Sequence, residues 1–157
     1  MKLDISSLRQ YIKPFDVFNP YELYALLRLR SEVFVVEQNC AFLDADNKDQ
    51  VCLHLLIYQD EALAAYARLV PPGVSYREMS IGRIVTSKQT RGTGLGKELM
   101  KRAIQACYDH FGEGPIRIGA QVYAIPFYQS VGFVVDGEVY DEDGIDHVEM
   151  LRKTDAL

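Results

Sequence analysis

Apolar residues in the first quarter of the chain recur at helical spacing after a helix-start signal. Asn19 is the predicted cap, Pro20 the first helical residue and Glu22 the third, an order that satisfies the free N–H groups of a first turn. The apolar positions that follow keep this spacing as far as Phe34. The pattern therefore predicts a helix over residues 19–38.

Continuous apolar runs after this segment predict strands. Residues 51–59 and 62–70 form two such runs, separated only by Asp60 and Glu61, which indicates a hairpin. Residues 76–87 predict a further strand. From Leu95 the apolar positions fall on one face and the charged positions on the other, which predicts an amphipathic helix that ends at Gly112.

The last third of the chain predicts a strand over 114–122 and two closing strands over 133–140 and 146–153. Between them residues 125–132 predict a short helix, with Pro126 in its first turn and Gly132 at its end. We therefore expect one domain over residues 1–157, an α+β fold in which helices cover a mostly antiparallel, mixed sheet.

Composition narrows the function classes. The chain has 157 residues and a formal net charge of -5, which argues against duplex nucleic acid as a partner, because phosphate binding requires a basic face. Its three cysteines have no CxxC spacing and indicate free thiols in a reducing compartment. No apolar run approaches the length of a membrane span. We expect a cytoplasmic protein without a membrane partner.

Three glycines stand between the predicted strand 76–87 and the helix that starts at Leu95. Gly92, Gly94 and Gly96 can present main-chain N–H groups and a helix dipole to an anion. The P-loop pattern fails, because its first glycine would fall on Arg91, and the dinucleotide pattern fails, because its third glycine would fall on Lys97. A merely flexible loop is the alternative, but flexibility does not explain glycines that adjoin a well-formed helix.

Two motifs carry a resemblance to a known family. The segment QTRGTGLG fits the pattern QxxGxG from Gln89 to Gly94, and AIPFYQSVGF fits AxxFYxxxGF from Ala124 to Phe133. Both resemble the GNAT superfamily of N-acetyltransferases, in the same order and spacing. The segments LRLRSEVFVVEQ and GEVYDEDGIDHVEM further resemble its ElaA-like subgroup, so the resemblance covers almost the whole chain.

The resemblance implies acetyl transfer from acetyl-CoA to a primary amine, by direct attack in a ternary complex, in a cleft between splayed central strands. It places a coenzyme diphosphate at the glycine turn and the pantetheine arm along the end of the preceding strand. One departure is Gln121, where many members have Asn. The implied cofactor contacts are Ile84, Val85, Thr86, Gln89, Arg91, Gly92, Thr93, Gly94, Leu95, Gly96, Lys97 and Gln121.

The catalytic groups follow from the same resemblance and from proton chemistry. Tyr128 matches the family's usual acid and would protonate the leaving thiolate, unless it only fills the core. The attacking amine needs a base, for which Glu37, His54, Glu78 and His147 are available. We keep Glu37 and His147 as candidates. A buried, hydrogen-bonded role is the commoner outcome for His54, and a solvated strand position for Glu78.

Charged residues elsewhere have simpler interpretations. Arg83 lies among apolar neighbours and needs a partner, for which Glu37 or Asp146 would serve. The acidic segment 44–49 fails the calcium-loop pattern, and we expect no metal site. Acidic segments 42–50 and 141–146 would suit a cationic acceptor, although such runs are usually solvated.

Alternatives stay open at this point. The donor could be a longer acyl-CoA, and the protein could instead be a catalytically inactive acyl-CoA sensor or interaction module. An exposed strand edge would allow a homodimer. The sequence does not identify the amine acceptor.

Overall fold

The computed structural model describes residues 2–154 and contains two four-stranded sheets. In the first sheet all neighbours are antiparallel, in the order β1 (Leu8–Pro14), β2 (Leu53–Gln59), β3 (Ala62–Val70) and β4 (Ser80–Thr86). In the second, β8 (Ile145–Arg152) lies between β5 (Ile116–Gln121) and β6 (Val134–Val135) and also pairs with β7 (Tyr140–Glu142). The expected α+β fold and the β2–β3 hairpin are confirmed.

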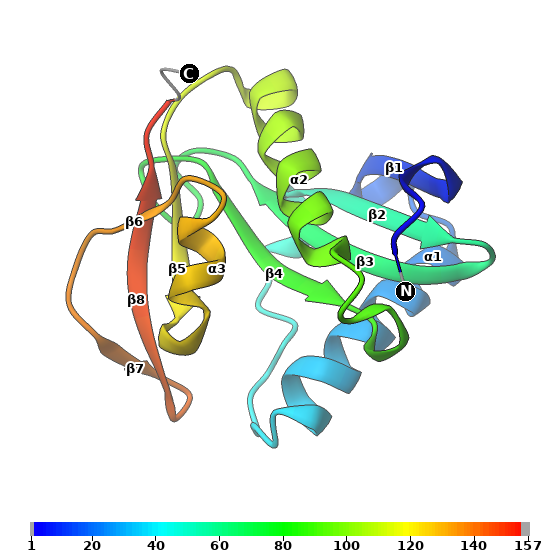
Figure 1. Ribbon diagram of the computed structural model, residues 1–157, viewed down its shortest axis with the longest axis horizontal. Helices are drawn as coiled ribbons and strands as arrows, with labels where there is room; N and C mark the ends of the chain where they lie inside the picture. The colour runs from blue at the N-terminus through cyan, green and yellow to red at the C-terminus, as the bar shows by residue number, and fades with distance from the viewer. Residues whose placement is uncertain (1, 155–157) are drawn as a thin grey trace.

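Within residues 2–154, backbone hydrogen bonding joins the two sheets only at the start of β4 and β5. Met79 and Ile116 form a single parallel bridge, and the Arg117 N–H donates to the Met79 carbonyl at 3.0 Å. Beyond this point the two strands separate, as Figure 1 shows for the green β4 and the yellow β5. The expected splay of the central strands is therefore present.

The first helix is shorter than the apolar spacing predicts. α1 spans Pro20–Arg30 and begins with the predicted reciprocal cap between Asn19 and Glu22. The chain then widens into a π-helix over Ser31–Glu37, with hydrogen bonds that span five residues, such as that from the Cys40 N–H to the Val35 carbonyl at 3.0 Å. The expectation of one α-helix over 19–38 was wrong, because apolar spacing does not distinguish a helix that widens from one that continues.

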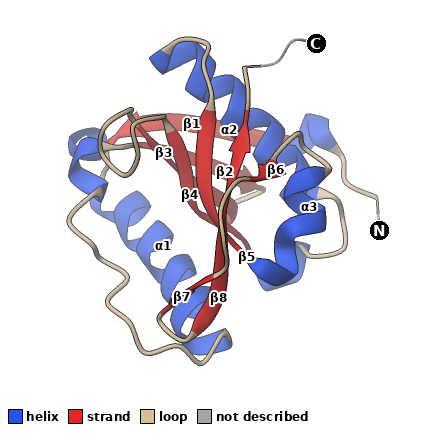
Figure 2. Ribbon diagram, turned by 90° about the vertical axis from the view of Figure 1, so that its left-hand side faces the viewer, coloured by secondary structure: helices blue, strands red, loops and turns tan. Residues whose placement is uncertain are grey.

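Helices cover both faces of the sheets. α2 (Leu95–Phe111) and α3 (Ile125–Gln129) lie on one face, and α1 lies on the other (Figure 2). α2 ends at Gly112 as predicted, whereas α3 is shorter than the predicted 125–132. Short 3-10 turns complete the described elements: Ile5–Ser7, Phe15–Val17, Asp49–Val51, Lys88–Thr90 and Val122–Ala124.

The core has two parts, one on each face of the first sheet. The larger lies under α2 and continues into the second sheet through residues such as Ile118 and Met150. The smaller joins Leu26 and Leu29 of α1 to Tyr66 and Val85 of the first sheet. The second sheet is thus anchored at α2 and free to diverge from β4 on the opposite face. Within residues 2–154 no helix combines the length and the apolar character that crossing a bilayer requires.

Candidate active site

A cavity of about 860 Å³ lies where β4 and β5 diverge. Its walls come from both sheets, the π-helix and the turn that follows β4. Eight of the residues proposed from the sequence line it: Glu37, Ile84, Val85, Thr86, Arg91, Gln121, Tyr128 and His147. The fold thus brings together residues that lie more than a hundred positions apart in the chain.

The glycine turn lies at the end of β4 and leads directly into α2. Gly92 and Gly94 have φ angles of +78° and +91°, which L side chains rarely adopt, and a Cβ at either would have no heavy atom within 4 Å. Gly94 caps α2 without any side-chain hydrogen bond. Within the described chain, the N–H groups of residues 92–97 donate to no intramolecular acceptor. These free donors and the positive end of the helix dipole form a site for an anion.

Other residues of the turn have structural roles. Leu95 is buried in the core, and Gly96 lies against the ring of Phe127. Lys97 lines a second cavity, of about 610 Å³, together with Lys101 and Arg152. This cationic cavity adjoins the first turn of α2 and suits a further phosphate group.

β4 contains a β-bulge in the middle of the cavity wall. Tyr66 pairs with Val85 and Arg68 with Gly82, so two residues of β4, Arg83 and Ile84, lie opposite Ala67 alone. Arg83 has a φ of +50°, which is uncommon for a residue with a side chain. A bulge leaves one residue outside the ladder and re-aims its neighbours. Here it falls where the sequence places the donor to the thioester carbonyl, at Ile84 or Val85.

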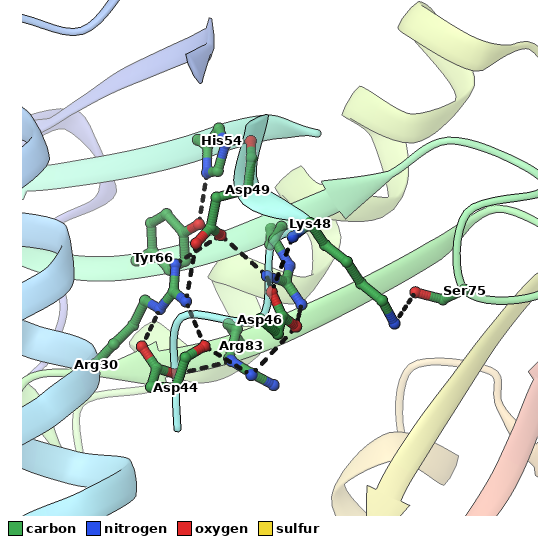
Figure 3. A network of polar contacts seen from close by, with 10 residues as sticks. Arg30, Asp44, Asp46, Lys48, Asp49, His54, Tyr66, Ser75 and Arg83 are labelled. Carbon is green, nitrogen blue, oxygen red and sulfur yellow. Dashed lines mark hydrogen bonds and ion pairs between the residues drawn. The ribbon is translucent and has the colours of Figure 1, made fainter. Parts of the chain in front are cut away.

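The side chain of Arg83 belongs to a closed ring of ion pairs beside the bulge (Figure 3). Three arginines and three aspartates alternate around it. The six N–O distances are 2.8 Å for Arg30–Asp44, 2.8 Å for Asp44–Arg83, 3.3 Å for Arg83–Asp46, 2.7 Å for Asp46–Arg68, 2.9 Å for Arg68–Asp49 and 2.8 Å for Asp49–Arg30. The Asp44–Arg83 contact is an ion pair whose hydrogen is not aligned for a hydrogen bond.

This ring, hereafter the ionic ring, ties the loop 44–49 to α1, β3 and β4. Burial disfavours ionisation of Asp46, but Arg68 and Arg83 outweigh it and hold its pKa below the ordinary value. The pKa of Asp49 is also lowered, because Arg30 and Arg68 outweigh its burial. Both carboxylates are therefore ionised at neutral pH and paired with arginines.

The ionic ring corrects one expectation. Arg83 pairs with Asp44 and Asp46, not with Glu37 or Asp146. The aspartates of the loop 44–49 neutralise arginines and leave little charge for a cationic acceptor. Sequence reasoning missed Arg30 and Arg68. For Arg68 the available signal was the same as for Arg83, a lone arginine in a predominantly apolar segment, whereas Arg30 stands beside Arg28 and Glu32 and gave no such signal.

Tyr128 lies on α3 with its ring edge against Phe127 and Phe133, at centroid distances of 5.2 Å and 6.0 Å. It also lines the cavity, and its hydroxyl has no hydrogen-bond partner among residues 2–154. Burial, with a smaller effect of Tyr123, raises the pKa of Tyr128 to about 12. The phenol is therefore protonated at neutral pH and can donate into the cavity.

The end of the π-helix reaches across the cavity mouth. Arg91 donates two hydrogen bonds to the carboxylate of Glu37, at 2.5 Å and 2.6 Å, and this pairing lowers the pKa of Glu37. The adjacent Gln38 accepts a hydrogen bond from the Gln121 amide at 3.2 Å. The two contacts join the π-helix to the glycine turn and to β5. Both carboxylate oxygens of Glu37 are thus engaged.

The histidines differ in their surroundings. His54 is fully buried. Its Nε2 donates to the Asp49 carbonyl at 2.8 Å, and its Nδ1 accepts from the Tyr66 hydroxyl at 2.6 Å. The expected buried, hydrogen-bonded role of His54 is therefore confirmed. His147 lines the cavity, where its Nδ1 donates to the Ile145 carbonyl at 2.8 Å and its Nε2 lies 3.3 Å from Glu142. Glu78 pairs with Arg117 outside the cavity lining.

The described part of the chain contains no cluster of metal-ligating side chains, and two of its thiols are buried and unactivated. No three His, Cys, Asp or Glu side chains there are grouped so that they could hold a metal ion. Burial raises the pKa of the Cys107 thiol to about 12 and is the main cause that raises that of Cys52 to about 11. Neither thiol is activated as a nucleophile.

The geometry of the turn, the splayed strands and the position of Tyr128 can be compared with known proteins. The family model of the acetyltransferase (GNAT) domain matches residues 28–154. The chain belongs to the GNAT acetyltransferase family. Its free N–H groups at the glycine turn and its divided sheet are thus features of a GNAT fold.

Relatives at high similarity support the assignment. The protein ElaA of Escherichia coli K12 is 42% identical over 134 residues, which cover 84% of this chain and 88% of ElaA. The crystal structure of E. coli ElaA superposes with a TM-score of 0.86 at 37% identity, covering 93% of this chain and 99% of ElaA. An acyl-CoA N-acyltransferase from Pseudomonas aeruginosa superposes with a TM-score of 0.87 at 42% identity, with the same coverage of 93% and 99%.

Proposed function

We propose that this GNAT protein transfers the acetyl group of acetyl-CoA to a primary amine, by direct attack in a ternary complex. The observation that carries the proposal is the row of N–H groups at residues 92–97, which have no acceptor among residues 2–154 and lie after the strand that lines the cavity. Membership of the family and the similarity to an acyl-CoA N-acyltransferase support it.

The residues fit a coenzyme at three places. The glycine turn would bind the diphosphate through its main-chain N–H groups, since Gly92 and Gly94 put no Cβ in the way. Arg91 stands at the same turn but is shared with Glu37. Lys97 and Lys101 in the second cavity would hold a further phosphate.

The pantetheine arm carries amides that can pair like an extra strand with residues 84–86, because β5 has left that side of β4. Gln121 faces the same space from β5. To bind the pantetheine arm, it would either give up its hydrogen bond to Gln38 or keep that bond and bind the arm beside Gln38. The β4 bulge would direct the N–H of Ile84 or Val85 toward the thioester carbonyl oxygen, which it would polarise by a hydrogen bond.

Acetyl-CoA supplies an activated acetyl thioester at this point. Tyr128 holds its proton at neutral pH and would donate it from the hydroxyl to the departing sulfur. Its edge-on contacts with Phe127 and Phe133 fix the direction of the phenol. This availability and orientation support the acid role of Tyr128.

For the base we favour His147 over Glu37. The Nδ1 of His147 carries a proton, because it donates to the Ile145 carbonyl, so in the neutral ring Nε2 has the free lone pair. Nε2 would take a proton from the amine, and Glu142 beside it would stabilise the resulting imidazolium. Glu37 would first have to leave Arg91. We expect His147→Gln to lower kcat by about 100-fold.

The direct test measures CoA binding by calorimetry and thiol release from acetyl-CoA with a panel of primary amines. We expect binding, and release that requires an amine. Initial rates against both substrates should give intersecting lines, as a ternary complex requires. Binding without release for any amine would favour an acyl-CoA sensor. Faster release from a longer acyl-CoA would reassign the donor, and absence of CoA binding would contradict the proposal.

A further inference from the structure

The end of the cavity that lies away from the glycine turn, hereafter the chamber, is lined by Lys48, Ser75 and Tyr76. Ser75 and Tyr76 precede β4 and the glycine turn follows it, so the bulge lies between the two ends of the cavity. A hydrogen bond from the Cys40 thiol to the Asp143 carbonyl, at 3.3 Å, joins the loop after the π-helix to the β7–β8 hairpin. When the coenzyme is bound at the glycine turn, this chamber is the space left for the acceptor amine.

One wall of the chamber carries a cation without a carboxylate partner. Lys48 is half-buried, its ammonium donates to the Ser75 hydroxyl at 3.2 Å, and no carboxylate of the described chain lies within 4.0 Å of it. Figure 3 shows its side chain extending away from the ionic ring toward Ser75. The aspartates of its own loop are all engaged in the ionic ring, which is neutral in itself.

The second sheet contributes a negative charge to the cavity. Glu142, on β7, lies 3.3 Å from His147 Nε2 on β8, and both line the same cavity as Lys48. The chamber therefore has one positive wall, from the loop 44–49, and one negative wall, from the second sheet. An acceptor that carries both a positive and a negative group matches this arrangement.

We propose that the acceptor is an amino carboxylate, whose carboxylate binds Lys48 and Ser75 and whose amine lies at Glu142 and His147. The inference rests on the proposed acetyl transfer and specifies its substrate class. The Lys48 ammonium and the Ser75 hydroxyl would both donate charge-assisted hydrogen bonds to the carboxylate. A second cationic group at this place is repelled by Lys48, and a neutral group leaves the lysine unpaired.

The test compares ω-amino acids of two to five methylene groups with their matched primary amides and with diamines of equal length. Wild-type enzyme should favour at least one amino acid over its amide by about tenfold in kcat/KM. Lys48→Met should lower this ratio to about one, Ser75→Ala should lower it less, and Lys48→Glu should shift the preference to the diamine. Lys2→Met, at an exposed position, is the control and should keep the wild-type ratio.

CoA affinity and urea unfolding of each variant separate the acceptor site from the coenzyme site and from folding. Equal use of amide and amino acid throughout the wild-type series, or an unchanged ratio in folded Lys48→Met, would overturn the acceptor class but leave acetyl transfer standing. No thiol release with any member of the three series would overturn both.

Discussion

Two polar regions flank β4, and they differ in how their polar groups are satisfied. In the ionic ring, three arginines and three aspartates neutralise one another in the interior of the fold. At the glycine turn, the N–H groups of residues 92–97 have no partner within the described chain. The first region is closed and holds the bulge in place, and the second is open and can bind. The comparison shows that internal pairing of charges, rather than polarity, distinguishes scaffold from site.

The largest effect on stability should follow from opening the ionic ring. Arg30→Ala leaves Asp44 and Asp49 buried without one of their partners, and Arg30 itself is fully buried. We expect a loss of about 3–5 kcal/mol in the free energy of unfolding, measured in urea. Arg28→Ala removes an exposed pair with Glu32 and should cost less than about 0.5 kcal/mol. Similar values for the two variants would show that the ring does not hold the fold.

A large effect on catalysis, without one on stability, should follow from Tyr128→Phe. Loss of the phenol should lower kcat by about 100-fold and leave CoA affinity unchanged. Because burial is the main cause that raises the pKa of Tyr128 to about 12, the wild-type phenol keeps its proton and kcat should not fall between pH 8 and pH 10 from its ionisation. Tyr24→Phe, on the exposed face of α1, is the control. Full turnover by Tyr128→Phe would exclude the acid role.

The glycine turn and the ionic ring also differ in how far they could be predicted from the sequence. α2 and the β2–β3 hairpin were predictable, because amphipathic spacing and a polar break between apolar runs are local signals. The glycine turn was predictable from its motif. The ionic ring was not, because its members are brought together by the fold, and nothing near Arg83 in the chain indicates Asp44. The π-helix was missed for lack of a local signal that separates it from an α-helix.

The ionic ring should also make the free energy of unfolding depend on pH in the acid range. This effect should be of intermediate size. The pKa values of Asp46 and Asp49 are lowered on folding, so their contribution is present above the unfolded pKa of about 4 and is lost as the pH falls through the lower folded values. Asp46→Asn should cost about 2 kcal/mol at pH 6. This difference from wild type should shrink steadily from pH 5 to pH 2.5 in urea unfolding. A difference independent of pH would contradict the assignment.

The smallest effect should follow from Glu37→Gln at the cavity mouth. The side chain is exposed, and its loss frees Arg91 without uncovering any buried group. We expect unchanged unfolding and a change in kcat of less than about fivefold, since exposed ion pairs contribute little. The measurement is the steady-state kinetics of Glu37→Gln, determined in parallel with those of His147→Gln. A loss of kcat as large as that of His147→Gln would restore Glu37 as the base.

The most direct test of the open turn uses the two glycines that bound α2. Gly94 and Gly112 both have a φ of +91°, and a Cβ at either has no heavy atom within 4 Å. Gly112 has a ψ of 159°, a conformation open almost only to glycine, so alanine there is at least as strained as at Gly94. Calorimetry should show that Gly94→Ala lowers CoA affinity by about tenfold or more, while Gly112→Ala leaves it unchanged. Equal affinities in the two folded variants would contradict the assignment of the turn as the diphosphate site.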